Sequence, residues 1–275
     1  MTLMPPFAPL PSTKAALIRN LLRHKRARDA ERVFVVEGLK PILELLRASP
    51  SALHAVVLTP ACLEKNGADL HPTLKHAGVQ VYTCRETVFR TLTDVRSSQG
   101  ILAAVYQPNW SEEVILERPQ LFGIYGECLQ DPANVGAIIR TAAAFGVDAC
   151  WLSPDSADVF NPKVVRATAG AVLKLPVFSL ADIGMLAQHR CTILAAEPAG
   201  SGSTDIHTIR HLPPRLILAL GNESRGLSEV TLKLAAGRVY IPVSPAVESL
   251  NVAASAAIAL FYLSGLPRQA VGERQ

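Results

Sequence analysis

Short apolar runs alternate with helix-like stretches along most of the chain. In the first part, apolar runs predict strands over residues 33–36, 54–58, 79–83 and 101–106, separated by helical patterns at 40–47 and 85–92. A second alternation predicts strands at 121–125, 149–152, 192–196, 216–220 and 239–241, followed by a helix at 250–263. Such alternation is typical of parallel sheets, whose ligands bind beyond the carboxyl ends of the strands. We therefore expect two α/β units.

Composition predicts where these units begin and end. The segment 108–118 brings Pro, Asn, Ser and three glutamates, which is typical of a linker. It separates a predicted N-terminal α/β domain at 1–107 from a larger domain at 119–268, and residues 269–275 form a tail. Residues 1–12 carry four prolines and are predicted to be unstructured.

Positive charge is concentrated near the N-terminus. The 275 residues have a net charge of +4, but residues 1–32 alone hold seven Lys and Arg against two acids. Arg19, Arg23 and Arg26 have the spacing of one helical face, and four Leu and Ile residues between 17 and 22 form an apolar stripe. A basic amphipathic helix of this kind is either a solvated face docked by its leucines or a surface for RNA phosphates. Charge alone favours neither.

Three loops, each following a predicted strand, hold polar residues that a surface position does not explain. They span residues 131–140, 221–228 and 241–251. In the helix predicted after residue 134, Arg140 is the one charge among apolar and small residues, so it needs a partner or a ligand. Because all three loops lie beyond the carboxyl ends of predicted parallel strands, they are expected to form one site.

Together the three loops resemble the signature motifs of the SpoU/TrmH family of RNA ribose 2′-O-methyltransferases. The first motif, an Asn, a Gly and an Arg-Thr-Ala, is matched by Asn134, Gly136 and residues 140–142. The second, a strand ending in Gly-x-Glu-x-x-Gly, is matched by Gly221, Glu223 and Gly226. The third, Ile-Pro and then Ser-Leu-Asn-Val, is matched by Ile241, Pro242 and residues 249–252. The resemblance covers residues 119–267 and departs from the family at Thr168 and Pro245.

The resemblance implies a parallel sheet tied in a deep trefoil knot, S-adenosylmethionine as the cofactor and a homodimer as the working form. The implied catalytic residues are Asn134, Arg140, Glu223, Ser249 and Asn251. The implied cofactor-binding residues are Leu220, Gly221, Asn222, Gly226, Ile241, Pro242, Leu250 and Asn251. With RNA as the implied substrate, the candidate RNA contacts are Arg19, Arg23, Arg26, Lys163 and Arg166. The stretch at 33–38 also resembles the family's accessory domain, which is similar to ribosomal RNA-binding proteins.

Ordinary structural roles compete with these assignments. Asn134 is suited to cap a helix starting at Val135, and Ser249 is suited to cap the last helix. Arg140 could form a salt bridge with Glu223. A guanidinium stays protonated in proteins, so it is better suited to anchor phosphate or to polarise a hydroxyl than to act as a base. The identity of the general base is therefore left open.

Composition argues against several other classes of protein. Five widely spaced cysteines without a Cys-x-x-Cys pair argue against a disulfide framework and a zinc site, so no metal is expected. The apolar stretches are too short to span a bilayer, and the proline-rich start lacks the basic residues of a signal peptide, so a cytoplasmic protein without a membrane partner is expected. The chain has no Gly-x-Gly-x-x-Gly loop, which disfavours a dinucleotide enzyme.

These observations favour a two-domain α/β enzyme that uses S-adenosylmethionine to methylate a ribose 2′-oxygen in structured RNA. Ribosomal RNA of the 23S type is the favoured substrate, because the chain has a separate N-terminal domain and, by the family resemblance, small relatives that act on tRNA usually have different extensions. Two alternatives stay open. One is the same chemistry on tRNA, and the other is a non-catalytic RNA-binding or ribosome-assembly protein with the same fold.

Overall fold

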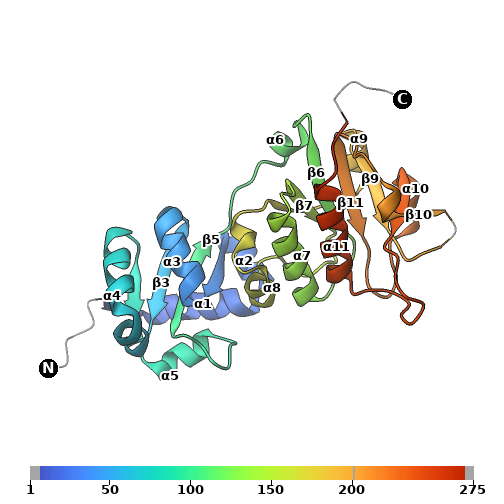
Figure 1. Ribbon diagram of the computed structural model, residues 1–275. Coiled ribbons are helices and arrows are strands. Elements are labelled where there is room, and N and C mark those ends of the chain that lie inside the picture. Colours follow the sequence, from blue (N-terminus) through green and yellow to red (C-terminus); the bar gives the residue numbers. More distant parts are fainter. Residues whose placement is uncertain (1–6, 201, 270–275) are drawn as a thin grey trace. The chain divides into compact units, whose positions relative to one another are not determined.

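The computed structural model describes residues 7–200 and 202–269, and the chain divides into two compact units (Figure 1). The first unit runs to Pro108 and also includes Phe160–Arg166. The second unit comprises Asn109–Val159 and the chain from Ala167 onward. Residues 160–166, which follow the first signature motif in sequence, are therefore grouped with the N-terminal unit.

The first unit is built on a mixed five-stranded sheet with the order β1-β4-β3-β5-β2. Its strands are β1 (Ala8–Pro9), β2 (Val33–Glu37), β3 (Leu53–Leu58), β4 (Val81–Thr83) and β5 (Ile101–Tyr106). Its helices are α1 (Ser12–Arg23), α2 (Lys25–Glu31), α3 (Leu39–Ala48), α4 (Pro60–His76) and α5 (Glu86–Phe89), with short 3₁₀ turns η1 (Pro50–Ala52) and η2 (Arg90–Leu92). The central strand β5 runs antiparallel to both β2 and β3.

The basic helix predicted near the N-terminus is divided in two. Helix α1 ends at Arg23, His24 is extended (φ −123°, ψ 118°), and α2 begins at Lys25. Arg28 explains the break, because its side chain is only 3% exposed and donates a hydrogen bond of 2.5 Å to the Leu21 carbonyl near the end of α1. The prediction that Arg26 shares one helical face with Arg19 and Arg23 is therefore wrong, since Arg26 lies on a separate helix.

Two further elements of the first unit differ from the expectation. Helix α4 was not apparent in the sequence because Gly67 and Pro72 lie within it and interrupt the helical pattern. Residues 8 and 9, within the segment predicted to be unstructured, form β1 and pair in parallel with β4.

The second unit is built on a seven-stranded sheet with the order β10-β12-β9-β11-β6-β7-β8, in which every neighbouring pair is parallel. Its strands are β6 (Leu121–Gly126), β7 (Ala149–Leu152), β8 (Val177–Ser179), β9 (Thr192–Ala196), β10 (Ser203–Asp205), β11 (Arg215–Leu220) and β12 (Gly237–Tyr240). Its helices are α6 (Glu112–Leu116), α7 (Pro132–Ala144), α8 (Pro162–Thr168, shared with the first unit), α9 (Gly184–Gln188), α10 (Glu229–Leu234) and α11 (Val252–Ser264), with 3₁₀ turns η3 (Ala171–Leu173) and η4 (Ile206–Thr208). The predicted parallel α/β sheet is confirmed.

The core of this unit depends on a close fit around Trp151. Its ring is fully buried, and a Cβ atom added at Gly123 on the neighbouring strand would lie 2.6 Å from it. Ile115 and Leu116 of α6 are buried in the same cluster, and Trp151 donates a hydrogen bond from Nε1 to Glu112 Oε1 at 2.6 Å. Part of the stretch whose composition is typical of a linker is thus folded onto the second unit.

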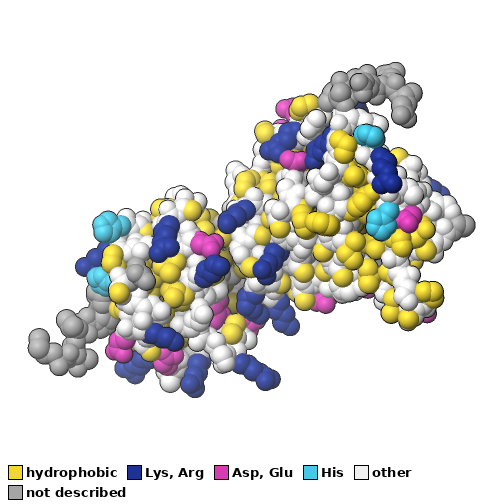
Figure 2. All heavy atoms as spheres, viewed as in Figure 1, with side chains coloured by type: hydrophobic (Ala, Val, Ile, Leu, Met, Phe, Trp, Pro, Cys, Tyr) yellow, Lys and Arg dark blue, Asp and Glu magenta, His cyan; other side chains and the backbone are white. Residues whose placement is uncertain are grey.

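Helices α7 and α11 pack side by side in the second unit (Figure 1). Both bury one side: α7 buries Ile138 and Ile139 among others, and α11 buries Leu260 and Leu263 among others. The rings of Phe145, just after α7, and Phe261 on α11 are in contact at 5.9 Å. Figure 2 shows hydrophobic side chains exposed over this region of the surface.

Three other expectations concern membrane spans, the cysteines and the knot. No helix within the described ranges is long and apolar enough to cross a membrane. All five cysteines are free thiols, of which Cys84 and Cys128 are half-buried and the other three are buried. The trefoil knot implied by the resemblance stays a prediction.

Candidate active site

The site is assembled from loops at the carboxyl ends of β6, β11 and β12. Asn134 follows β6, Glu223 follows β11 and Asn251 follows β12. Asn134 donates a hydrogen bond from Nδ2 to Glu223 Oε1 at 2.5 Å, and Asn251 donates one from Nδ2 to Asn134 Oδ1 at 3.0 Å. Residues up to 117 positions apart in sequence therefore form one continuous polar network, as expected for loops at the same edge of a parallel sheet.

Helix capping differs from the expectation at both helices of the site. Helix α7 begins at Pro132 and is capped by Asp131, whose Oδ1 accepts from the Ala133 N–H at 2.9 Å. Asn134 is instead buried inside the first turn, so the prediction that it caps a helix starting at Val135 is wrong. Asn134 is left to bind Glu223 and Asn251.

At the last helix, the asparagine of the network is itself the cap. Asn251, and not Ser249, is the cap of α11: its Oδ1 accepts from the N–H groups of Ala253 and Ala254 at 2.9 and 3.3 Å. Its Nδ2 group points the other way, to Asn134. Asn251 therefore both starts the helix and belongs to the network.

The second loop is a tight turn that has no space for a side chain at its first residue. A Cβ atom at Gly221 would lie 2.3 Å from the carbonyl carbon of Gly226. Asn222 and Gly226 exchange backbone hydrogen bonds at 3.1 and 2.8 Å, and Gly226 has a positive φ of 68°. The Asn222 side chain is used within the protein: its Oδ1 accepts from two N–H groups of the turn and its Nδ2 donates to the Cys128 carbonyl. The side chain of Asn222 and its backbone N–H and C=O groups are therefore all used within the protein, to hold the shape of the turn.

Glu127, which no motif in the sequence indicated, fastens the second loop to the end of β6. Its carboxylate accepts from the Ser228 N–H at 2.9 Å and from the Ser228 hydroxyl at 2.7 Å. Next to it, Cys128 has φ 53°, and its N–H donates to Ser153 Oγ at 2.7 Å. The only sequence signal was an unexplained acid directly after an apolar strand.

The third loop contributes half-buried apolar residues between exposed ones. Ile241 and Leu250 are half-buried, Leu220 at the end of β11 is buried, and Pro242 is exposed. Ser249 is also exposed, and it makes no hydrogen bond with any residue that the structure describes. The structure therefore does not bring Ser249 into the polar network.

Arg140 lies apart from this network. It follows Asn134 by six residues on α7, which corresponds to roughly 9 Å along the helix axis and about 120° around it. It is exposed, and within residues 7–200 and 202–269 no acceptor or carboxylate is paired with it. The alternative of a salt bridge with Glu223 is not realised, because the Glu223 carboxylate accepts from Asn134 instead.

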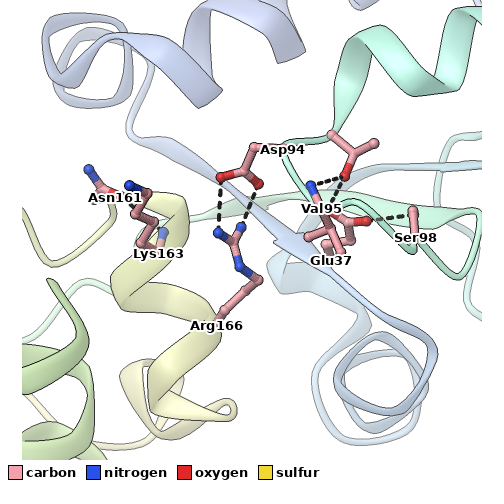
Figure 3. A network of polar contacts seen from close by, with 8 residues as sticks. Glu37, Asp94, Val95, Ser98, Asn161, Lys163 and Arg166 are labelled. Carbon is pink, nitrogen blue, oxygen red and sulfur yellow. Dashed lines mark hydrogen bonds and ion pairs between the residues drawn. The ribbon is translucent and has the colours of Figure 1, made fainter.

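The candidate RNA contacts are in differing environments. Arg19 donates to Thr91 Oγ1 at 3.2 Å, whereas Arg23 and Arg26 are exposed. On α8, Arg166 forms a bidentate ion pair with Asp94 at 2.6 and 2.9 Å, while Lys163 is exposed (Figure 3). Arg166 therefore has a structural role within the first unit.

Beside this ion pair, Glu37 at the end of β2 accepts hydrogen bonds from the Thr93 and Ser98 hydroxyls at 2.7 and 2.6 Å (Figure 3).

No cluster of His, Cys, Asp and Glu suited to a metal ion occurs in the described part of the chain. The polar groups of the site are thus amides, carboxylates and backbone.

Comparison with known proteins places this geometry in a family. Residues 123–261 match the model of the SpoU rRNA methylase family, and residues 17–103 match that of the MRM3-like substrate binding domain. An uncharacterized tRNA/rRNA methyltransferase of Synechocystis is 31% identical over 261 residues, which cover 92% of each chain. The 23S rRNA (guanosine(2553)-2′-O)-methyltransferase RlmP of Bacillus subtilis is 28% identical, over 89% of this chain and 93% of that protein. The crystal structure of an AdoMet-bound rRNA methyltransferase from Sinorhizobium meliloti is similar with a TM-score of 0.78, at 26% identity over 93% of this chain and 95% of that one.

The fold and the site define an α/β RNA methyltransferase built on a parallel sheet. More particularly, the chain belongs to the SpoU rRNA methylase family, because the family model matches about half of it and a relative above 30% identity spans nearly all of it. The family resemblance, the α/β fold and the enzyme class predicted from the sequence are confirmed.

Proposed function

We propose that this protein transfers the methyl group of S-adenosylmethionine to a ribose 2′-oxygen in structured RNA, with 23S-type ribosomal RNA as its substrate. The observation that carries the proposal is the network of Asn134, Glu223 and Asn251, which joins all three signature loops at one edge of the sheet. The names of the relatives support the substrate, since RlmP of Bacillus subtilis is a 23S rRNA 2′-O-methyltransferase. A cytoplasmic location stays a prediction.

The second and third loops fit the cofactor. A Cβ atom added at Gly226 would meet nothing within 4 Å, so an adenosine group can approach the backbone of this turn closely at Gly226. Ile241 and Leu250 are half-buried and provide apolar contacts on either side of the exposed third loop. When bound, S-adenosylmethionine supplies a methyl group that is already electrophilic, so this chemistry does not require a metal.

The protein's residues position the ribose hydroxyl and the loops around it. Asn134, Glu223 and Asn251 hold the three loops in register through their mutual hydrogen bonds. Arg140 has five N–H donors that no neighbour uses among the described residues, and a protonated guanidinium is suited to anchor a phosphate next to the target ribose and to polarise its 2′-hydroxyl.

The active form is a homodimer in this proposal. Helix α11 exposes an apolar stripe of Ala254, Ile258 and Phe261, of which Phe261 is 69% exposed. Arg140 lies on the exposed side of the adjacent helix α7. A contiguous apolar surface of this kind is typical of an interface. Pairing of two copies there would direct Arg140 of one copy towards the loops of the other, which accounts for its distance from Asn134.

Mapping of 2′-O-methyl groups tests the proposal. Ribosomal RNA and tRNA from cells with and without the gene are compared, and purified protein is then given each RNA with labelled S-adenosylmethionine. We expect one ribose in 23S-type RNA to lose its methyl group without the gene and to regain it in vitro. A lost site in tRNA would move the substrate to the tRNA alternative, and unchanged maps with no transfer in vitro would favour the non-catalytic alternative.

A further inference from the structure

A pocket of about 420 Å³ lies in the first unit, where β3 begins and β5 ends. Its volume falls within the range of small-ligand pockets, about 300–1,000 Å³. Lys14 of α1, His54 of β3 and Tyr106 at the end of β5 line it, together with Gln80 before β4. None of these residues belongs to the signature motifs or to the network described above.

The hydrogen bonds among these residues determine which groups act as donors. Lys14 Nζ lies 3.1 Å from His54 Nε2, and an ammonium group can only donate, so Nε2 is the acceptor. His54 Nδ1 therefore carries the ring proton and donates to the Tyr106 oxygen at 3.0 Å. The Tyr106 hydroxyl proton is then directed away from His54, and two of the three Lys14 protons remain for another partner.

His54 is suited to this arrangement because its environment favours the neutral ring. Burial lowers the pKa of His54, the nearby Lys14 charge lowers it further, and Glu31 opposes them with the smallest of the three effects. A neutral imidazole accepts from Lys14, whereas a protonated one would repel it.

The other residues that line the pocket include no negatively charged side chain. Gln80 Oε1 accepts from the Tyr82 hydroxyl at 3.0 Å, and the Gln80 amide N–H groups have no acceptor among the described residues. No carboxylate lines the pocket, and Lys14 gives it a positive charge. The pocket therefore offers one ammonium, one phenol and one amide as donors, which is the chemistry that recognises an anion.

We propose that this pocket binds a phosphate group, with Lys14 providing the charge and Tyr106 and Gln80 providing hydrogen bonds. Its size accommodates a phosphate with an attached sugar. Two sources carry this group: the backbone of RNA, in which case the site extends the proposed function by adding a substrate contact in the N-terminal unit, or a free phosphate. The competing explanation is that Lys14 and His54 only fasten α1 to the sheet.

The test uses the full-length protein and two probes, inorganic phosphate and an oligouridylate. The imidazole signals of His54 are followed by nuclear magnetic resonance and assigned with a His54→Gln variant. Lys14→Gln removes the charge of the pocket. Lys75→Gln is the matched control, because Lys75 is an exposed lysine on α4, two residues before the lining residue Ala77, and does not itself line the pocket. Melting temperatures verify that each variant is folded. A Lys14→Arg variant keeps the positive charge and tests whether charge alone is sufficient for binding.

We expect phosphate to shift the His54 signals in wild type and in Lys75→Gln, but not in Lys14→Gln. If RNA is the source, Lys14→Gln also weakens oligouridylate binding by about fivefold to tenfold at low salt and reduces the salt slope by roughly 0.7, the value for one phosphate contact on a single strand. A response to phosphate without a change in RNA binding identifies free phosphate as the source. Unshifted His54 signals with both probes, or equal behaviour of the two Lys→Gln variants, would overturn the proposal. A failure of methyl transfer with an intact His54 response would count against the proposed function and not against this site.

Discussion

The two ends of helix α7 present polar side chains in opposite ways. Near its start, Asn134 is buried and both ends of its amide are used, one by Glu223 and one by Asn251. Two turns later, Arg140 is exposed, and the described residues give it no partner. Buried polar groups need partners within the chain, whereas an unpaired cation on an apolar helix surface is available for a ligand or a second molecule. The first end therefore builds the site within one chain, and the second end is available to complete a site elsewhere.

Arg140→Ala is expected to have the largest effect. Methyl transfer should fall by about 10²- to 10³-fold, the cost of removing one electrostatic contact to the reacting groups. Affinity for S-adenosylmethionine should stay within about tenfold of wild type, because the second and third loops provide the cofactor contacts. Turnover is measured with labelled cofactor and affinity by calorimetry. Turnover close to wild type would show that Arg140 is a solvated surface charge.

Gly221→Ala tests the part of the site that is built within one chain, where the second loop meets the Asn134 network. The added Cβ would lie 2.3 Å from the Gly226 carbonyl carbon, so the turn has to open. Overpacking of this kind costs about 1–3 kcal/mol, and we expect cofactor affinity to fall by up to about 10²-fold. Gly265→Ala is the control, since its Cβ would meet its nearest neighbour at 3.7 Å. Wild-type affinity in Gly221→Ala would remove this turn from the cofactor site.

Phe261→Asp tests whether the exposed stripe of α11 is an interface. A charge placed in a buried apolar contact should weaken association of the two copies by roughly tenfold to a hundredfold. Sedimentation at micromolar and nanomolar concentrations measures this, together with activity at each concentration. Val230→Asp is the matched control, because Val230 is a 60% exposed hydrophobic residue on α10 in the same unit. Identical sedimentation of wild type and Phe261→Asp would refute the interface.

Asn251 allows the smallest and most specific effect, because its two functions can be separated. Asn251→Asp keeps the oxygen that caps α11 but loses the N–H donor to Asn134. We expect its melting temperature to change little while turnover falls several-fold. Asn251→Ala loses the cap as well and should cost about 1 kcal/mol of stability. Equal turnover in Asn251→Asp and wild type would show that Asn251 acts only as a cap.

The sequence was sufficient to predict the parallel sheet and the edge at which the site forms. Apolar runs identified β6, β11 and β12, and the motif spacing placed Asn134, Glu223 and Asn251 after them. The Asp-Pro pair at 131–132 was also a signal for the true start of α7, since Pro is favoured at the first position of a helix, but Asn134 obscured it.

Other features depend on three-dimensional relations that one sequence does not contain. Glu127 and Ser228 are 101 residues apart, and no local pattern connects them. Whether Arg140 or Asn134 faces Glu223 depends on the rotation of α7 against the sheet, which its mixed apolar pattern does not determine. The break at His24 arises because Arg28 turns inward to the Leu21 carbonyl, although arginine is rarely buried.

Complementation between two variants, assayed at a cofactor concentration at which neither is active alone, tests the central claim most directly. Arg140→Ala and Gly221→Ala proteins are mixed, allowed to exchange subunits, and assayed for methyl transfer. If Arg140 acts on the loops of the second copy, each mixed dimer contains one site with both changes and one site with neither. We then predict recovery to about a quarter of wild-type activity after random exchange. Exchange that proceeds while the mixture stays as inactive as the two parents would contradict the account, because it would place Arg140 and the cofactor loops of one site on the same chain.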